Sequence, residues 1–327
     1  MPIRSNIQDN KTAFSSDILK LQSQNLENKI KIPVYQRKYT WKKTKVEQLF
    51  NDFKEHLDYV ESTDSRDKVS YYLGNIVLVE TTSNDKKVFE VLDGQQRLTS
   101  LYILICAIRY SFKKIYENAL NNLETNDQVQ QLKSYYNDII EDLNDHILNY
   151  DNEPFLEIYF KDDRIHFSHI LNNINFDENK PRNILKSHPI YTAMLTFIEC
   201  IEDFLDERTK VITSGDLKDI DNQKFKELKE FMLYVTGKYS ELTYTLLRSG
   251  EMEYTVFETL NDRGENLTCY DLTRNIMFGI ADGWEDIHKK TQKIFDDDTD
   301  NEIDSINENC RNKQNKFVAT NARKLIL

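Results

Sequence analysis

The sequence has little glycine, proline or cysteine. Its 327 residues include 8 glycines and 5 prolines, so few positions break regular structure and a helix-rich globular protein is expected. The 4 cysteines are far apart and show no paired ligand spacing; they are Cys106, Cys200, Cys269 and Cys310. Neither a disulfide framework nor a cysteine-based zinc site is therefore expected.

Long apolar runs and an excess of positive charge are also absent. No stretch of eighteen apolar residues occurs, and the first residues lack the apolar core of a signal peptide, so we expect a cytoplasmic protein with no membrane partner. The net charge of −12 argues against non-specific coating of nucleic acid, because neutralisation of phosphates supplies most of that affinity. Any contact with nucleic acid must be local.

The most informative stretch is the sequence DGQQRLT at 93–99. A β-like run over 88–92 precedes it, and apolar residues recur at helical spacing after it, which predicts a strand-to-helix turn. The first N–H groups of such a helix lack intrahelical partners and attract anions. Gly94 allows close approach to the backbone, Arg97 can bind a phosphate, and Asp93 can cap the helix or hold a metal ion. An ordinary Asp cap explains the same residues.

A second stretch, KIPVYQRKYTW at 31–41, mixes aromatic and basic side chains in an extended segment. Thr40 or Thr44 is expected to cap the next helix, whose buried face would contain Val46, Leu49, Phe50 and Phe53. The aromatic residues can be ordinary core. The residues Gln36, Arg37 and Lys38 are harder to bury, and an anionic ligand could pair with them.

The remaining pattern predicts a small α+β layer with many helices. Antiparallel strands are expected over 71–80 and 87–92, with Gly74 marking a close approach of backbone or ligand, and a further strand over 241–247. Helices are expected over 11–29, 188–208 and 222–237, with mostly helical sequence from 112 to 150 and a possible hairpin formed by 155–160 and 164–167. The histidines at 166, 169 and 188 lack metalloprotease spacing and are expected to be structural or surface residues.

A third region, NDRGENLT at 261–268, links two expected helices. A glycine C-cap followed by a threonine N-cap explains much of this pattern. Arg263 nevertheless lies in a tight link, where it could offer a second phosphate-binding arginine to the same cleft.

Together these stretches resemble the N-terminal domain of GmrSD-type, modification-dependent (type IV) restriction endonucleases. The resemblance rests on 32–41, Leu73–Val77, 92–99 and 257–268, followed by Asp271, Leu272 and Asn275. It implies a core similar to ParB and sulfiredoxin. It also implies a nucleoside triphosphatase that senses modified phage DNA and controls a nuclease domain or subunit.

The resemblance and the residue chemistry together assign three groups of site residues. The catalytic residues would be Asp93, Gln96 and Arg97, which would act on a nucleoside triphosphate bound with Mg²⁺. Asp93 would position the metal ion or the attacking water. Nucleotide binding is assigned to Gly94, Gln95, Arg37, Asn261 and Arg263. Contact with DNA is assigned to Tyr35, Gln36, Lys38, Trp41, Lys42 and Lys43, with Lys45 nearby.

The predicted fold is α+β, with a small ParB/sulfiredoxin-like mixed sheet, large helical insertions and a helical C-terminal part. We expect a nucleotide-binding core over 1–112, a helical insertion over 113–240, a completing part over 241–295 and an acidic linker and tail over 296–327. No His-centred nuclease motif follows residue 288, so this chain alone is not expected to cut DNA. The chain could also form a homo-oligomer.

Two alternatives remain open at the level of sequence. One is a ParB-like switch that binds nucleotide without hydrolysing it and thereby favours a closed or dimeric state on DNA. The other is a sulfiredoxin-like thiol enzyme, which would need an activated cysteine at the turn; Cys106 instead lies well inside an apolar helix.

Overall fold

The computed structural model describes residues 8–14, 29–33, 36–63, 70–83, 86–123, 125–148, 153–172, 188–210, 217–237 and 240–248. Several predictions lie outside these residues. They include the role of Tyr35 and the whole region 251–295, with Asn261 and Arg263.

A six-stranded mixed sheet has the order β1-β6-β3-β4-β2-β5. The β1–β6 and β3–β4 pairs are antiparallel, whereas β3–β6, β2–β4 and β2–β5 are parallel. The strands are β1 (Gln8–Phe14), β2 (Lys29–Ile32), β3 (Tyr71–Ser83), β4 (Lys86–Asp93), β5 (Leu156–Ile158) and β6 (Ser240–Arg248). This arrangement confirms the predicted α+β class with a mixed sheet, and the similarity to ParB stays a prediction.

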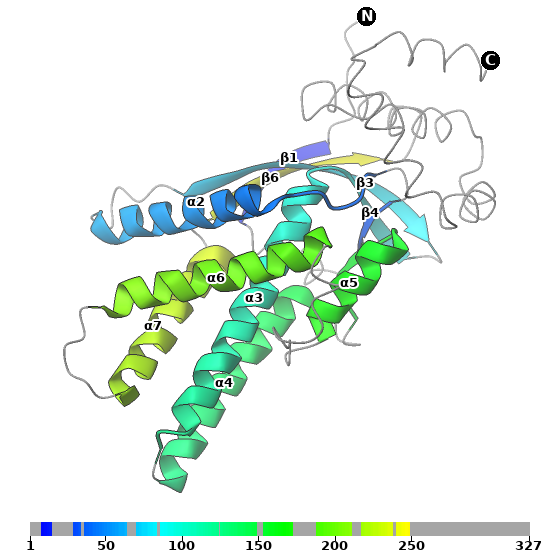
Figure 1. The fold of residues 1–327 in the computed structure, drawn as a ribbon. Coiled ribbons are helices and arrows are strands. Elements are labelled where there is room, and N and C mark those ends of the chain that lie inside the picture. Colours follow the sequence, from blue (N-terminus) through cyan, green and yellow to red (C-terminus); the bar gives the residue numbers. More distant parts are fainter. Residues whose placement is uncertain are drawn as a thin grey trace, which may run out of the picture.

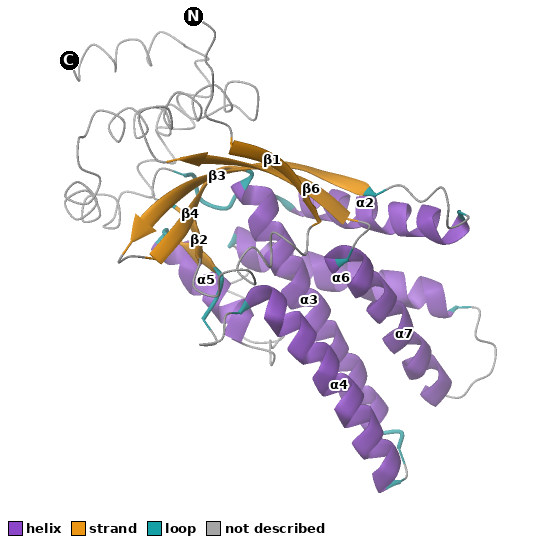
Figure 2. Cartoon of the chain, turned by 180° about the vertical axis from the view of Figure 1, so that it is seen from behind, coloured by secondary structure: helices purple, strands orange, loops and turns teal. Residues whose placement is uncertain are grey.

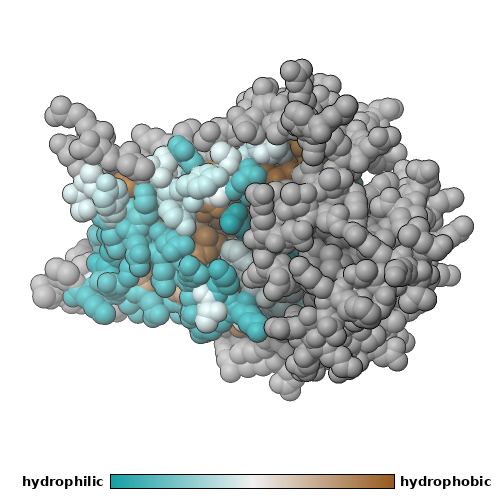
Figure 3. Space-filling model, turned by 90° about the horizontal axis from the view of Figure 1, so that it is seen from above, coloured by the Kyte–Doolittle hydropathy of each residue, from teal (hydrophilic) through white to brown (hydrophobic). Residues whose placement is uncertain are grey.

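The helices of the described chain lie on one face of the sheet (Figures 1 and 2). They are α2 (Lys43–Ser62), α3 (Gln95–Leu120), α4 (Asn126–Ile147), α5 (Lys161–Asn172), α6 (Pro189–Thr209) and α7 (Leu217–Thr236). None of them is both long and apolar enough to cross a membrane. Seen from above, the described surface is mostly hydrophilic, with hydrophobic residues showing between (Figure 3).

Helix α3 is the centre of the core. Every residue from Leu98 to Arg109 is buried, and the helix packs against α4, α5, α6 and α7. A helix that is apolar on all sides is stable only when other elements surround it. On the neighbouring helices, Phe50 of α2, Phe204 of α6 and Phe231 of α7 pack with ring centroids 5.0 to 6.4 Å apart. The strand-to-helix turn therefore begins a helix that is buried and packed on several sides by other helices.

Most predicted elements are confirmed. Strands cover 71–80, 87–92 and 241–247, and helices cover 189–208 and 222–236. The helix after residue 41 buries Val46, Leu49, Phe50 and Phe53 as expected. Helix α3 continues through residue 112, so the sheet and the helical part share one helix across the first predicted domain boundary.

One predicted element is wrong, and another is wrong at its ends. In the helix predicted over 11–29, residues 11–14 lie instead in β1, which pairs with β6, and residue 29 begins β2; residues 15–28 lie outside the described part of the chain. The second strand of the hairpin, 164–167, lies in α5, where Asp163, Phe167 and Ile170 are buried at helical spacing. In both segments tertiary pairing and burial decide between patterns that are short and ambiguous in sequence.

Candidate functional site

The strand-to-helix turn is closed by Gly94, which adopts the left-handed conformation with φ 87° at the N-cap of α3. A Cβ atom there would lie 2.9 Å from Cγ1 of Ile76, so glycine is required by space as well as by conformation. The predicted Asp93 cap is wrong, because the cap residue has no side chain and α3 has no side-chain cap hydrogen bond. The first N–H groups of the helix thus remain available to an anion.

The two glutamines after Gly94 hold the extended segment of residues 36–40, here called the 36–40 segment. Gln95 Nε2 donates to the carbonyl of Arg37 at 2.8 Å. Gln96 Nε2 donates to the carbonyl of Lys38 at 2.9 Å, and Gln96 Oε1 accepts from the backbone N–H of Thr40 at 2.8 Å. Both glutamines are buried, so their amide groups join α3 to the 36–40 segment.

Further bonds fix the 36–40 segment at its two ends. Gln36 Nε2 donates to the carbonyls of Val91 and Leu92 in β4, at 3.1 and 2.7 Å. The backbone N–H of Tyr39 donates to Asp163 Oδ2 at 2.7 Å. The Tyr39 hydroxyl lies 2.7 Å from Ser100 Oγ, and burial raises the pKa of this phenol above its usual range. Tyr39 is therefore a core residue, and Gln36, which was assigned to DNA contact, is buried against β4.

Arg97 lies across β3 at Gly74. A Cβ atom on Gly74 would lie 2.7 Å from Nη1 and 3.0 Å from Cζ of Arg97, and Arg97 Nη1 donates to the carbonyl of Asn75 at 3.4 Å. Gly74 has φ 100° and lies where the β3–β6 register shifts between Tyr72 and Asn75. A group does approach Gly74 closely, but it is the Arg97 guanidinium and not the backbone or ligand that was predicted.

Arg97 opens onto a cleft of about 260 Å³ between α2 and β3, here called the Arg97 cleft. Its lining mixes cationic, acidic and aromatic side chains: Trp41, Lys45, Gln48, Leu49, Asp52, Tyr71, Tyr72, Leu73, Gly74 and Arg97. The Tyr71 hydroxyl donates to Asp52 Oδ2 at 3.0 Å. Burial, and then this carboxylate, raise the pKa of Tyr71 to about 12, against the opposing effect of Arg97. Arg97, predicted to bind phosphate, and Trp41, predicted to bind DNA, therefore line the same cleft.

The predicted DNA-binding lysines lie at the start of α2. Lys42 is the N-cap residue and has no side-chain cap bond, so the capping role predicted for Thr40 or Thr44 is wrong. Lys43 Nζ lies 2.7 Å from Glu199 of α6 and 3.9 Å from Glu47, and hydrogen bonding to Glu199 raises its pKa. Part of the local positive charge is therefore already paired within the chain.

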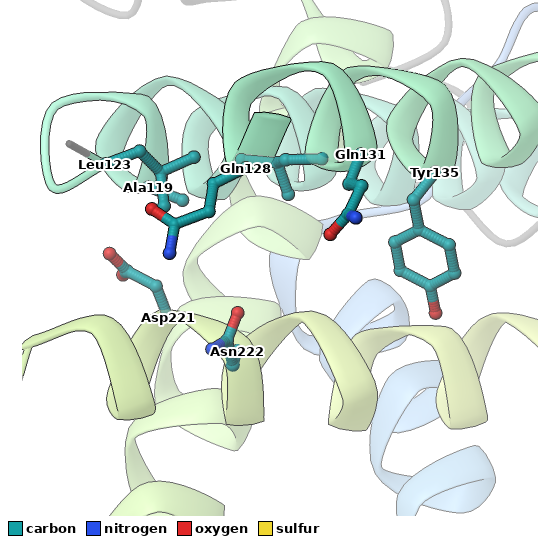
Figure 4. A pocket seen from close by; sticks show the side chains of 8 residues that line it. Ala119, Leu123, Gln128, Gln131, Tyr135, Asp221 and Asn222 are labelled. Atoms are coloured by element: carbon teal, nitrogen blue, oxygen red, sulfur yellow. The ribbon is translucent and has the colours of Figure 1, made fainter. Parts of the chain in front are cut away.

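A second cavity, of about 370 Å³, lies between α7 and the α3–α4 pair (Figure 4). Figure 4 shows Gln128 and Gln131 facing Asp221 and Asn222 across it, with Tyr135 at one end. The lining also includes Ala119, Leu123 and Leu132. It has a carboxylate and no cationic side chain, so it does not suit a phosphate.

Two arrangements of polar side chains were not predicted from the sequence. His166 and His188, expected to be structural or surface residues, stack with ring centroids 3.8 Å apart beside Asp162 and Asp163. The spacing of Asp162 and His166, four residues apart on one helix, was the available signal. Arg109 is buried and donates to Asn144 Oδ1 at 2.8 Å and to the carbonyl of Leu171 near the end of α5.

The fold and this turn define an α+β protein in which a helix N-terminus and an arginine are available to an anion. The family model described as GmrSD restriction endonuclease, N-terminal domain, matches residues 16–278. The chain belongs to this family, as its motifs predict, and is a component of a restriction system that acts in defence against phage. Among curated proteins, no sequence matches the chain.

Proposed function

We propose that the chain is a nucleoside triphosphatase sensor that acts with DNA and with a nuclease domain or subunit. The observation that carries the proposal is the uncapped N-terminus of α3 at Gly94 with Arg97 three residues later. Backbone N–H groups and a helix dipole favour phosphate, and an arginine can add two parallel hydrogen bonds. Membership in a restriction family makes DNA the expected target.

The residues of the turn fit a nucleotide with Mg²⁺. Asp93 ends β4 next to Gly94 and is half-buried, so its carboxylate can hold a divalent ion beside the helix N-terminus. Bound Mg²⁺ would neutralise phosphate charge. Arg97 would bind phosphate oxygens, and Gln95, through its bond to the Arg37 carbonyl, keeps the backbone of Arg37 beside the turn. Phosphoryl transfer depends mainly on such positioning and charge stabilisation.

A non-hydrolysing switch is the second candidate, and one observation favours it. Both amide atoms of Gln96 are used on the backbone of the 36–40 segment, so this side chain is not available to orient a water molecule while those bonds persist. In a switch, nucleotide binding would instead favour one arrangement of the turn and the 36–40 segment through differential contacts.

The test is nucleotide binding and phosphate release from each nucleoside triphosphate, with and without DNA. For Arg97→Ala we expect nucleotide affinity to fall by about 1.5–3 kcal/mol, because one charge-assisted contact is lost. Arg164→Ala, at an exposed position on α5, is the matched control and should bind as the wild type does. Unchanged affinity in folded Arg97→Ala protein would contradict the site. Binding without turnover would select the switch.

A further inference from the structure

Three buried glutamines join the 36–40 segment to both sides of the strand-to-helix turn. Gln36, Gln95 and Gln96 have exposed fractions of only 5%, 6% and 7%. Gln36 lies in the segment and donates to two carbonyls near the end of β4, at 3.1 and 2.7 Å. Gln95 and Gln96 lie on the other side of Gly94 and bond to the backbone of the segment. The segment therefore follows any change in the geometry of the turn.

The two glutamines of α3 occupy the positions whose backbone N–H groups an anion would bind. Gly94 is the N-cap residue, so Gln95 and Gln96 are the first two residues of the helix. The N–H groups at these positions have no carbonyl of their own helix to bind, and the first bond of the helix runs from Leu98 to the carbonyl of Gly94 at 3.0 Å. A phosphate at the turn would thus bind the backbone of the same residues whose side chains hold the segment.

The 36–40 segment leads directly to residues assigned to DNA contact. Trp41 and Lys42 follow it, and Lys42 is the N-cap residue of α2. Within the segment, Arg37 and Lys38 provide the carbonyls that the two glutamines of α3 bind. The placement of these aromatic and cationic residues therefore depends on how firmly the backbone of the segment is held.

We propose that Gln95 and Gln96 are positioning residues that couple nucleotide binding to DNA binding, an inference that rests on the proposed function. A phosphate bound to the N–H groups of the first turn fixes that turn, and its two glutamine side chains then hold the 36–40 segment for DNA. A segment that one ligand has already ordered costs the second ligand less to order, so each ligand favours the other. The effect is reciprocal by linkage. Neither side chain has to touch the DNA or the transferred phosphoryl group.

A purely structural role of the two glutamines gives a different expectation. If they stabilise only the fold, their removal changes DNA affinity by the same factor with and without nucleotide. If they couple the sites, their removal changes the ratio of these two DNA affinities. The ratio is therefore the quantity to measure.

The first experiment measures the affinity of the whole chain for fragments of modified phage DNA at fixed low salt. It is repeated with an excess of each of the four ribonucleoside triphosphates and Mg²⁺. For the wild type we expect nucleotide to raise DNA affinity by roughly 5–150-fold. In Gln95→Met/Gln96→Met, which keeps the length of both side chains and removes their amides, this factor should fall to about 1. Nucleotide affinity without DNA should stay as in the wild type, because the N–H groups and Arg97 remain.

Single variants grade the effect and keep the test available if the double variant does not fold. Gln96→Met removes the bonds to the Lys38 carbonyl and the Thr40 N–H, whereas Gln95→Met removes one bond, so the factor should fall further in Gln96→Met. Gln130→Met, at an exposed position on α4, is the matched control and should keep the factor of the wild type.

The outcomes separate this inference from the proposed function. Absence of nucleotide binding by the wild type would overturn both. Nucleotide binding that leaves DNA affinity unchanged, or the wild-type factor in folded variants of both glutamines, would overturn the inference alone. A loss of nucleotide affinity without DNA as large as that of Arg97→Ala would also overturn it, because the glutamines would then be ligands of the nucleotide.

Hydrogen exchange tests the same link without DNA and without any activity. The N–H of Tyr39 is bound by Asp163 and by neither glutamine of α3, so it reports how firmly the segment is held. Nucleotide should slow its exchange in the wild type and in Gln130→Met, and should leave it unchanged in Gln95→Met/Gln96→Met. Equal exchange in the wild type with and without saturating nucleotide would overturn the link.

Discussion

At Gly74, a missing side chain makes room for the Arg97 guanidinium. We predict that Gly74→Ala lowers the free energy of unfolding by roughly 1–2 kcal/mol, because φ 100° is unfavourable for alanine. The added Cβ would also lie 2.7 Å from Arg97 Nη1 and displace it, so nucleotide affinity should fall. Nucleotide titration and denaturant unfolding measure the two effects.

A double-mutant cycle separates those effects. If Gly74→Ala weakens nucleotide binding only by moving Arg97, it should cause no further loss of affinity in the Arg97→Ala background, while its cost in stability persists. Equal losses of affinity in both backgrounds would show that Gly74 acts through the backbone and not through Arg97.

The described cysteines are poor nucleophiles. Burial raises the pKa of both the Cys106 and the Cys200 thiols to about 11, and nearby carboxylates add to the shift at Cys200. A pKa raised from 9.0 to about 11 leaves about one hundredth of the ordinary thiolate at pH 8. We therefore expect slow alkylation of both residues at pH 8 by peptide mapping, with Cys200 reacting faster as the pH approaches 11. Rapid alkylation of Cys106 in folded protein would reopen the sulfiredoxin-like alternative.

At the scale of elements, the join between α3 and the 36–40 segment depends on Gln96 more than on Gln95. Gln96→Leu would remove the side-chain partner of the Lys38 carbonyl and of the Thr40 N–H, at a cost of about 0.5–1.5 kcal/mol for each of these part-buried hydrogen bonds. Gln95→Leu removes only the bond to the Arg37 carbonyl. We predict faster exchange of the Thr40 N–H in Gln96→Leu than in Gln95→Leu, measured under identical native conditions. Equal exchange in the two variants would contradict this division.

The elements that could be predicted from sequence are those with a local signal. Residues 76–79 are apolar and buried, and Phe50 and Phe53 lie on one face of α2, so period and burial agree. The strand β1 could not be predicted, because its partner β6 lies more than 200 residues away and its polar sequence carries no period of two. Pairing that depends on distant residues leaves no local pattern.

The candidate site could be predicted only as a location. The turn, Gly74 and Arg97 follow from residue types, and the structure brings Arg97 together with Trp41 and Lys45. The cap could not be predicted, because the close approach of Ile76 to Gly94 depends on the β3–β4 register shift between Val77 and Leu78. The hydrogen bonds from Gln95 and Gln96 to the 36–40 segment could not be predicted either, because they depend on where this segment crosses α3, which is a tertiary property.

At the scale of the whole molecule, the proposal separates sensing from cutting. We predict that the purified chain does not cleave modified or unmodified plasmid in Mg²⁺ and nucleotide. The sequence offers no histidine after residue 288, and the histidine pair of the described residues, His166 and His188, is buried or half-buried against carboxylates, where DNA cannot reach it. Robust, metal-dependent cleavage that survives stringent purification and disappears with a variant of this chain would show that it contains a nuclease site.

The Arg97 cleft contains cationic side chains, although the chain as a whole has a net charge of −12. Trp41, Lys45 and Arg97 line it together with one carboxylate, Asp52, and Lys42 and Lys43 follow Trp41 at the start of α2. A DNA segment would therefore be attracted here in preference to the acidic remainder. If nucleotide and DNA both contact groups next to Arg97, each ligand should change the affinity of the other by the same factor, of roughly 5–150-fold.

This coupling is measured by nucleotide binding and hydrolysis across a set of modified DNAs at fixed low salt. The paired variant Lys42→Ala/Lys43→Ala and the single variants Tyr35→Ala and Trp41→Ala should respond less to DNA than the wild type. Lys54→Ala is the matched control, since Lys54 lies on the same helix and, like Lys43, is ion-paired with a glutamate of α6, but does not line the Arg97 cleft. Its response should equal that of the wild type. If no DNA changes the rate or the affinity, the coupling fails, and the nucleotide must act in assembly with the nuclease partner instead, because a ligand with no differential effect on the DNA-bound state cannot report DNA.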